Sequence, residues 1–366
     1  MLKKTFLCLP VILYLSQLSY GQTLEKAPCP TKEWSRMTLA EQKLNPEPIN
    51  KLVNLIREGN SYPDIHSLLM VRNGFLILEE YFGEYNSEKI HTLQSVSKSF
   101  TSALIGIAIE KGFIKDVNEK ILSFFPDMKD IENMDERKKA IILKDLLTMR
   151  SGTDYNESYN GSPHHQLNRL SKGWDRFYLN RPMVSKPGSR FQYDSGGVIL
   201  MSAILNKRAG MHADKFAEKH LFPYLGIKRT HWIKNSEEHP HTGGGLFLLP
   251  QDMAKFGLLY LRGGKWEDKQ VVPEQWVAES FKMHHDFGGS RQYDIGYGYL
   301  WWILKPDPEG GGQKNIYAAK GFMGQYIFVI PEYDMVVVVT GGAKNGRDMR
   351  RPVAFLYSHI LPSIKK

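Results

Sequence analysis

"SVSKSFTSALIGIAIEKG", residues 95–112, is the stretch from which the fold of this 366-residue chain can be worked out. Its apolar residues recur at helical spacing around a broad face, so it predicts a buried helix over residues 95–111 that Gly112 ends. The helix opens with Ser95-x-x-Lys98, and residues three apart lie on nearly the same face of a helix. The stretch therefore predicts a serine and a lysine side by side at the start of a core helix.

This pair has the chemistry of an activated nucleophile. A serine hydroxyl is a weak nucleophile and needs a base beside it. The positive end of a helix dipole and partial desolvation favour a neutral lysine amine, which can accept the serine proton. We therefore predict that Ser95 is the nucleophile and Lys98 its base. The same spacing at Ser363-x-x-Lys366 is interpreted as a chance match, because we expect a frayed C-terminus with no pocket around it.

A second serine competes for the role of nucleophile. Ser195 lies in "FQYDSGGV", residues 191–198, whose "DSGG" is also found around the nucleophile of trypsin-like proteases. That mechanism needs a histidine base and a buried aspartate, usually in an all-β chain with paired cysteines. This chain is rich in helical patterns, and it keeps only Cys29 if Cys8 is removed with a leader. G-x-S-x-G is also absent, so an α/β-hydrolase is disfavoured as well.

Strand patterns concentrate near the two ends of the chain. "HSLLMVR" and "FLILEEYF" flank Asn73-Gly74, the strongest short hairpin signal. "YIFVI" and "MVVVVT" flank Pro331–Asp334 and predict a second hairpin. Residues 297–304 alternate around aromatic side chains and predict one further strand.

Helical patterns occupy the rest of the chain. We expect helices over residues 49–58 and 350–360, and residues 113–235 contain mostly helical patterns and loops. The predicted fold class is α+β: an antiparallel sheet built from both chain ends, flanked by helices, with a mostly helical insertion at about 113–235.

The first residues predict export. Lys3 and Lys4 precede an apolar run, and small residues follow it, which is typical of a signal peptide over residues 1–21 that is cut before Gln22. We therefore expect a periplasmic or secreted protein without stable membrane insertion. Residues 22–48 read as an N-terminal arm, and residues 49–366 as the main domain.

The composition excludes other functions. Hydrophobic residues make up 42% and charged residues 24% of the chain, as in ordinary globular proteins. The formal net charge is +9, of which Lys3 and Lys4 contribute two, leaving +7. The positive residues are scattered and no nucleic-acid module is recognisable, so we expect no nucleic-acid partner.

Several stretches together resemble the class C β-lactamase-like serine hydrolases. This family includes β-lactamases, D-alanyl-D-alanine peptidases, carboxylesterases and 6-aminohexanoate-dimer hydrolases. The similar stretches follow the family's order over about residues 50–360, and they are "SVSKSFTSALIGIAIEKG", "LKDLLTMRSGTDYNE", "KPGSRFQYDSGGVILMSAIL", "GGGLFLLPQDMAKFGLLYLRGGKW", "YGYLWW" and "AAKGFMGQYIFVIPEYDMVVVVTGG".

The resemblance implies a role for Tyr193. The family's second motif is Tyr-x-Asn; Tyr193 matches its tyrosine, and Ser195 falls on its third position. Tyr193 would then relay the proton to the leaving group, Ser195 would be a pocket residue, and "DSGG" would be a coincidence of spelling.

The third motif departs from the family pattern. Lactamases carry Lys-Thr-Gly there and many esterase relatives His-x-Gly, whereas this chain has Ala319-Lys320-Gly321. Lys320 and Gly321 stay candidate pocket residues, although adjacent strand residues face opposite sides. The missing cation argues against β-lactams and peptide termini as substrates. The backbone N–H groups of Phe322 and Ser95 would form the oxyanion hole.

The positions of some aromatic residues have two possible interpretations. Tyr155 lies in a family-like loop and is either a pocket residue or a solvated tyrosine. Tyr297, Tyr299 and Trp301 would share one strand face, in the core or along an acyl pocket.

The histidine pattern does not predict a complete metal site. His239 and His241 could make half a metal site, but no third ligand is evident. The pairs His164-His165 and His284-His285 are expected in surface loops.

The sequence thus predicts a serine acyl hydrolase that cleaves small-molecule esters or amides through an acyl-enzyme, without metal or cofactor. The alternatives are a β-lactamase or D-alanyl-D-alanine peptidase, and a non-catalytic binder of acyl compounds. The sequence leaves the oligomeric state open.

Overall fold

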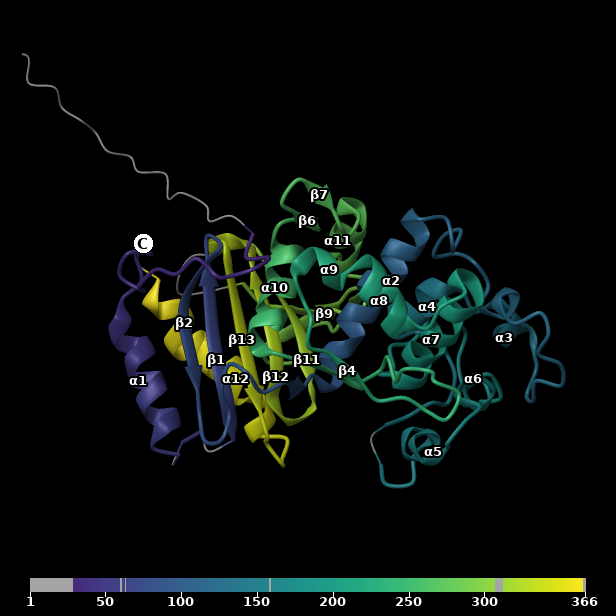
Figure 1. The fold of residues 1–366 in the computed structure, drawn as a ribbon. Coiled ribbons are helices and arrows are strands. Elements are labelled where there is room, and N and C mark those ends of the chain that lie inside the picture. Colours follow the sequence, from purple (N-terminus) through teal and green to yellow (C-terminus); the bar gives the residue numbers. More distant parts are fainter. Residues whose placement is uncertain (1–28, 60, 63, 158, 307–311, 365–366) are drawn as a thin grey trace, which may run out of the picture.

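The computed structural model describes residues 29–59, 61–62, 64–157, 159–306 and 312–364, and its centre is an eight-stranded antiparallel sheet (Figure 1). The strand order is β2-β1-β13-β12-β11-β10-β9-β8, so the two ends of the chain meet inside one sheet. The strands are β1 (Ile65–Arg72), β2 (Phe75–Tyr81), β8 (His285–Asp286), β9 (Asp294–Tyr297), β10 (Trp302–Leu304), β11 (Ile316–Gly321), β12 (Gln325–Ile330) and β13 (Met335–Gly341). The predicted α+β class is confirmed.

Both predicted hairpins are present. Asn73 and Gly74 both have positive φ, 50° and 83°, as a tight turn between right-twisted strands requires. The second hairpin turns through Pro331–Tyr333, and Asp334 also has positive φ. β1 then pairs with β13, with Leu69 opposite Val338, which joins the two hairpins edge to edge.

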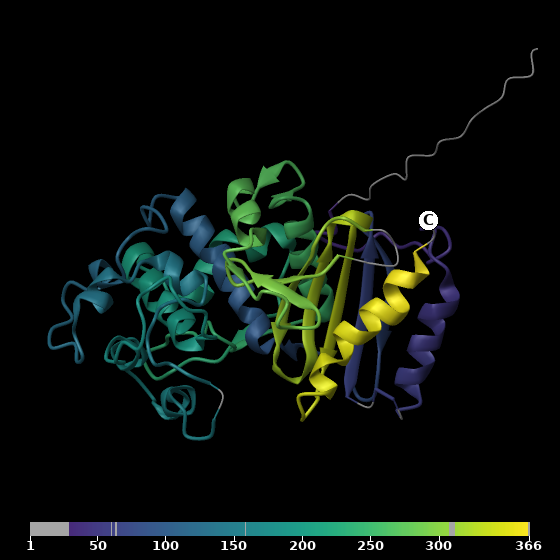
Figure 2. The same cartoon turned by 180° about the vertical axis from the view of Figure 1, so that it is seen from behind.

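Helices cover both faces of the sheet. Because alternate strand residues face opposite sides, Leu69 and Val338 enter one core while Leu68 and Val337 enter the other. The first core is closed by α2 (Ser97–Glu110) and α10 (Pro250–Leu261). The second is closed by α1 (Pro46–Arg57), α12 (Arg351–Phe355) and the helical turn Leu356–Ile360, which cross the sheet together (Figure 2).

The middle of the chain forms a mostly helical lobe beyond α2 (Figure 1). Its longest helix, α7, packs directly on α2, so α2 lies between the sheet and the lobe. The lobe's helices are η2 (Ile121–Phe124), α3 (Glu136–Ala140), α4 (Leu143–Leu147), α5 (Pro163–Arg169), α6 (Trp174–Leu179), α7 (Ser195–Ala209), α8 (Ala213–His220) and α9 (Phe222–Leu225).

Short elements complete the chain. The small sheets and the remaining helix are β3 (His91–Thr92), β4 (His231–Trp232) and β5 (Leu246–Leu248); β6 (Lys265–Trp266) and β7 (Lys269–Gln270); and α11 (Glu274–Phe281).

The prediction of one continuous strand over residues 297–304 is wrong. The chain reverses there: β9 ends at Tyr297, β10 begins at Trp302, and these two residues pair with each other. Leu300 has a φ of 60°, which a continuous strand does not allow. Tyr297, Tyr299 and Trp301 are nevertheless all buried, in the core rather than along one strand face.

The prediction of a frayed C-terminus around Ser363 is also wrong. Ser363 is fully buried; its hydroxyl donates to the Ile360 carbonyl, and its own carbonyl accepts a hydrogen bond from the Asn45 N–H. The N-terminal arm and the C-terminal segment thus hold each other in place. Lys366 and the predicted signal peptide lie outside the described residues. Among the described residues, no helix is long and apolar enough to cross a membrane.

Candidate active site

Ser95 lies in a short helical turn, η1 (Gln94–Val96), that leads directly into α2. The turn packs against the end of β11, where the backbones come very close. A Cβ atom on Gly321 would lie 2.5 Å from the Leu93 carbonyl oxygen, so only glycine fits there. This contact places the end of β11 beside the serine.

Lys98 faces Ser95 from the first turn of α2. Its Nζ donates hydrogen bonds to Ser95 Oγ at 2.8 Å and to the Gly243 carbonyl at 2.5 Å. Burial lowers the pKa of Lys98 to about 8, against the opposing effect of the Glu157 and Asp194 carboxylates. At pH 7 roughly a tenth of such amines are neutral, far more than for an ordinary lysine.

Tyr193 completes the group around Ser95. Its ring centroid lies 4.9 Å from Lys98 Nζ, and its ring stacks on Trp302 at 5.9 Å. Burial and then the charge of Glu157 raise the pKa of Tyr193, while a hydrogen bond with the Ser95 side chain acts in the opposite direction. The hydroxyl therefore carries its proton at neutral pH.

The "DSGG" letters have a structural explanation. Asp194 is the N-cap of α7 and accepts from the Gly197 N–H at 2.8 Å. It also accepts from the Tyr178 hydroxyl at 2.5 Å, and burial raises its pKa to about 6. A Cβ on Gly196 would overlap the Tyr155 ring at 2.4 Å. The segment is thus a helix start packed against two tyrosines, which orients the preceding Tyr193.

A pocket of about 620 Å³ opens in front of Ser95. Ser195, a predicted pocket residue, lines it, although its backbone N–H points to the Glu157 carboxylate. Phe322, whose backbone N–H is predicted for the oxyanion hole, lines the pocket as well. Phe322 and Ile233 are 54% and 49% exposed and form an apolar rim. No lysine or arginine from the described parts of the chain lines this pocket.

One wall of the pocket consists of polar residues that the sequence analysis did not identify. Asn168 bridges two histidines: it lies 3.0 Å from the Nε2 atoms of both His164 and His241. Burial lowers the pKa of His164, and it lowers the pKa of His241 to about 4, so both rings are neutral at pH 7. Glu157 supplies the carboxylate of this wall.

These residues come from three separated segments, so no local spacing could reveal them. The surface-loop expectation for His164-His165 is wrong, because both lie on α5 and line the pocket. Among the described residues, no group of three or more His, Cys, Asp or Glu side chains could hold a metal ion. His239 and His241 therefore do not extend into a metal site there.

Two other predicted pocket residues are placed elsewhere. Tyr155 is fully buried, with its hydroxyl 3.2 Å from His164 Nδ1, so it supports the wall from behind and is not a solvated loop residue. Lys320 points away from Ser95 and forms an ion pair with Asp294. Ala319, at the first position of the third motif, faces the core instead, so that position has no cation.

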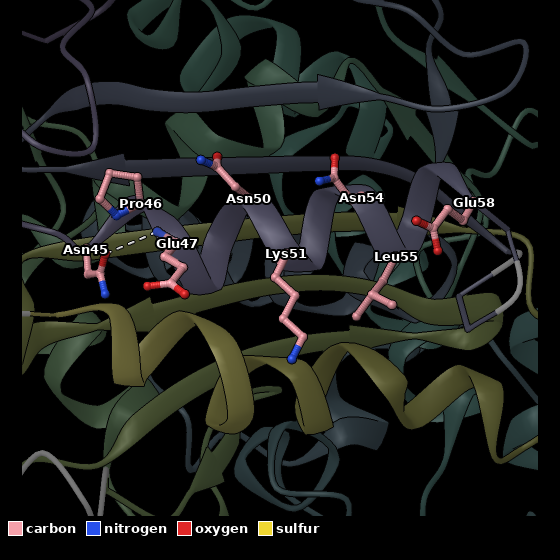
Figure 3. Close-up of a pocket in the computed structure, with 8 residues that line it drawn as sticks. All are labelled: Asn45, Pro46, Glu47, Asn50, Lys51, Asn54, Leu55 and Glu58. Atoms are coloured by element: carbon pink, nitrogen blue, oxygen red, sulfur yellow. Dashed lines mark hydrogen bonds between the residues drawn. The ribbon is translucent and has the colours of Figure 1, made fainter.

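A separate hollow follows the outer side of α1 (Figure 3). It is lined by α1 and the residues flanking it; Asn50 and Asn54 point to one side of the helix, and Lys51 and Leu55 to the other. It is on the opposite face of the sheet from α2, and none of the predicted catalytic residues lines it.

Comparisons with known proteins identify a family and related sequences. A family model described as Beta-lactamase matches residues 64–354. The 6-aminohexanoate-dimer hydrolase of Paenarthrobacter ureafaciens is 23% identical over 295 residues, which cover 74% of this chain and 71% of that protein.

Solved structures share the fold. A candidate 6-aminohexanoate-dimer hydrolase from Bacillus anthracis superposes with a TM-score of 0.74 at 19% identity, covering 92% of this chain and 89% of that one. EstCE1, a hydrolase with promiscuous acyltransferase activity, superposes with a TM-score of 0.73 at 18% identity, covering 87% of this chain and 100% of its own.

Proposed function

Because the chain belongs to the β-lactamase family and is a serine hydrolase, we propose that it cleaves small esters or amides through an acyl-enzyme on Ser95. The observation that carries the proposal is the 2.8 Å hydrogen bond from Lys98 Nζ to Ser95 Oγ. The lysine is buried and its pKa is lowered to about 8, which suits a general base near neutral pH.

The proposed reaction has two halves. Lys98 takes the Ser95 proton as Oγ attacks the substrate carbonyl, and the oxyanion accepts hydrogen bonds from the N–H groups of Ser95 and Phe322. Tyr193 donates its hydroxyl proton to the leaving alcohol or amine and takes the Ser95 proton from Lys98, and the carbonyl re-forms as an ester on Ser95. Water, deprotonated by the same Lys98–Tyr193 pair, then attacks this ester, and the pair returns the proton to Ser95 Oγ as the acid leaves.

The substrate preference rests on the missing cation. The position that holds Lys or His in relatives holds Ala319, and Lys320 is engaged with Asp294 on the other side of the strand. A β-lactam or peptide carboxylate would lose a charge-assisted contact worth about 1.5–3 kcal/mol. This disfavours the β-lactamase and D-alanyl-D-alanine peptidase alternatives, and the Ser95–Lys98 hydrogen bond disfavours a non-catalytic binder.

The test is turnover by the purified protein. We expect a burst of nitrophenol from a p-nitrophenyl ester, and a kcat/KM on short-chain esters or ω-amino-acid amides at least 10-fold above that on a chromogenic cephalosporin. Ser95→Ala should abolish both turnover and fluorophosphonate labelling, whereas the matched Ser195→Ala should still be labelled. Efficient cephalosporin hydrolysis would refute the substrate class, and a label on Ser195 would refute the nucleophile.

Export is also part of the proposal and rests on residues 1–21 alone. N-terminal sequencing of the protein from its native host should begin at Gln22; an intact N-terminus recovered from the cytoplasm would contradict it.

A further inference from the structure

A further hollow, partly open to solvent, lies where β9 and β11 meet the start of α12. It is a hollow of about 760 Å³ and shares no lining residue with the pocket in front of Ser95. Its size is in the usual range for small-molecule sites. The charged residues that line it are Arg291, Asp294, Lys320, Arg347, Arg350 and Arg351.

The charges in this hollow do not balance. Five cations face a single carboxylate, and Lys320 already forms an ion pair with that carboxylate, Asp294. Arg351 is paired at 2.7 Å with Asp348, just outside the hollow. Arg347 and Arg350 form no ion pair with any described residue. Within the described parts of the chain, two guanidinium groups at the hollow therefore have no ion-pair partner.

Part of this positive charge is buried. The Lys320 side chain is only 16% exposed, and its Nζ lies 4.8 Å from the centroid of the Trp302 ring. Burial is the largest cause that lowers the pKa of Lys320; the Asp294 carboxylate opposes it, and repulsion by Arg291 and Arg350 lowers the pKa further. Arg351 Nη1 is buried without a hydrogen-bond partner. Desolvated cations and unpartnered donors are costly, and a bound anion would offset that cost.

We infer that this hollow binds a small polyanion that carries at least two carboxylate or phosphate groups. Guanidinium groups bind such oxygens with paired hydrogen bonds, and Arg347 and Arg350, which form no ion pair with a described residue, would supply them at the rim. Lys320 and Arg351 Nη1 would contact the buried end of the ligand. Trp302 separates this hollow from Tyr193, on which it stacks at 5.9 Å, so the polyanion is not the acyl substrate.

Calorimetric titration of the full chain tests the inference, with pyrophosphate and citrate as probes at constant ionic strength. We expect saturable binding of at least one probe, and the stronger of the two identifies phosphate or carboxylate as the preferred group. Arg350→Ala should weaken binding about 10-fold or more, and Arg350→Lys should weaken it less. Arg169→Ala is the matched control, because Arg169 is also exposed but lies on α5.

Three outcomes would overturn the inference. One is no saturable heat with either probe. Another is equal weakening by Arg350→Ala and Arg169→Ala, which would show diffuse attraction to a basic surface. The third is loss of binding after fluorophosphonate labelling of Ser95, which would place the anion in the catalytic pocket. Circular dichroism confirms folding, and Arg350→Lys, which keeps the charge, guards against an effect of misfolding.

Discussion

Lys98 is buried at the start of α2, and its amine contacts both the Ser95 hydroxyl and a backbone carbonyl. Burial favours the neutral amine, and the nearby Glu157 carboxylate favours the charged one. The pKa of Lys98, the proposed proton acceptor, thus depends on two opposing effects, and burial is the larger of the two.

A pH profile should report this balance. Only neutral Lys98 can accept the proton, and its pKa is lowered to about 8, so kcat/KM on an ester should rise with pH through about pH 8. Glu157→Gln removes the carboxylate that raises the pKa of Lys98, so the rise should move to lower pH. The exposed Glu136→Gln should leave the profile unchanged; a Glu157→Gln profile moved to higher pH would contradict the assignment of Lys98 as base.

Tyr193 and Lys98 should act as one proton-transfer unit. Tyr193→Phe removes only the hydroxyl and should reduce kcat about 10²- to 10⁴-fold, and Lys98→Ala should cost at least as much. The double variant should be little worse than the worse single variant, because residues that act together are not additive. Kinetics of all three, with circular dichroism as the folding control, checks this; fully multiplicative losses would assign the two residues to separate steps.

At the scale of elements, the end of β11 and the turn η1 form a single contact that holds the site. Gly321→Ala would bring a Cβ within 2.5 Å of the Leu93 carbonyl, a backbone atom that cannot swing away. The strand and the serine turn must then separate, and misplacement by about 1 Å can cost on the order of 100-fold in rate.

We therefore expect Gly321→Ala to lower kcat/KM by about 10- to 100-fold while the protein still folds. Gly346→Ala is the control, because its nearest non-neighbouring heavy atom would be 4.0 Å away. Equal activities of the two variants would show that the close contact does not position Ser95.

At the scale of the whole molecule, β1 and β13 join the two ends of the chain between two cores. Leu68 and Leu69 are neighbours in β1 but enter opposite cores, and both are fully buried. If the sheet couples the cores, the molecule should unfold in one transition.

Leu68→Ala and Leu69→Ala should each destabilise the protein by about 2–5 kcal/mol and shift that same transition. Urea unfolding followed by tryptophan fluorescence and by circular dichroism measures the shift. An exposed change such as Leu170→Ala should have little effect. Two separate transitions, one for each core, would contradict the coupling.

The sequence by itself determined the features that depend on local chemistry. Asn73-Gly74 forces a tight turn, a broad apolar face makes α2 a core helix, and Ser95-x-x-Lys98 lies within one helical turn. Local pattern failed at residues 297–304, where alternating aromatic residues look the same in a strand and in a buried turn. Aromatic side chains can be buried in the core equally well from a strand and from a turn.

Only the tertiary structure decided what the lysines and carboxylates do. Lys320 lies on β11 and forms an ion pair with Asp294, whereas Lys98 lies in the first turn of α2 and donates a hydrogen bond to Ser95. Glu157 and Asn168 reach the pocket from separate segments because the helical lobe folds over α2. Charge and pKa depend on the distance and burial of groups far apart in the chain, which only the folded structure defines.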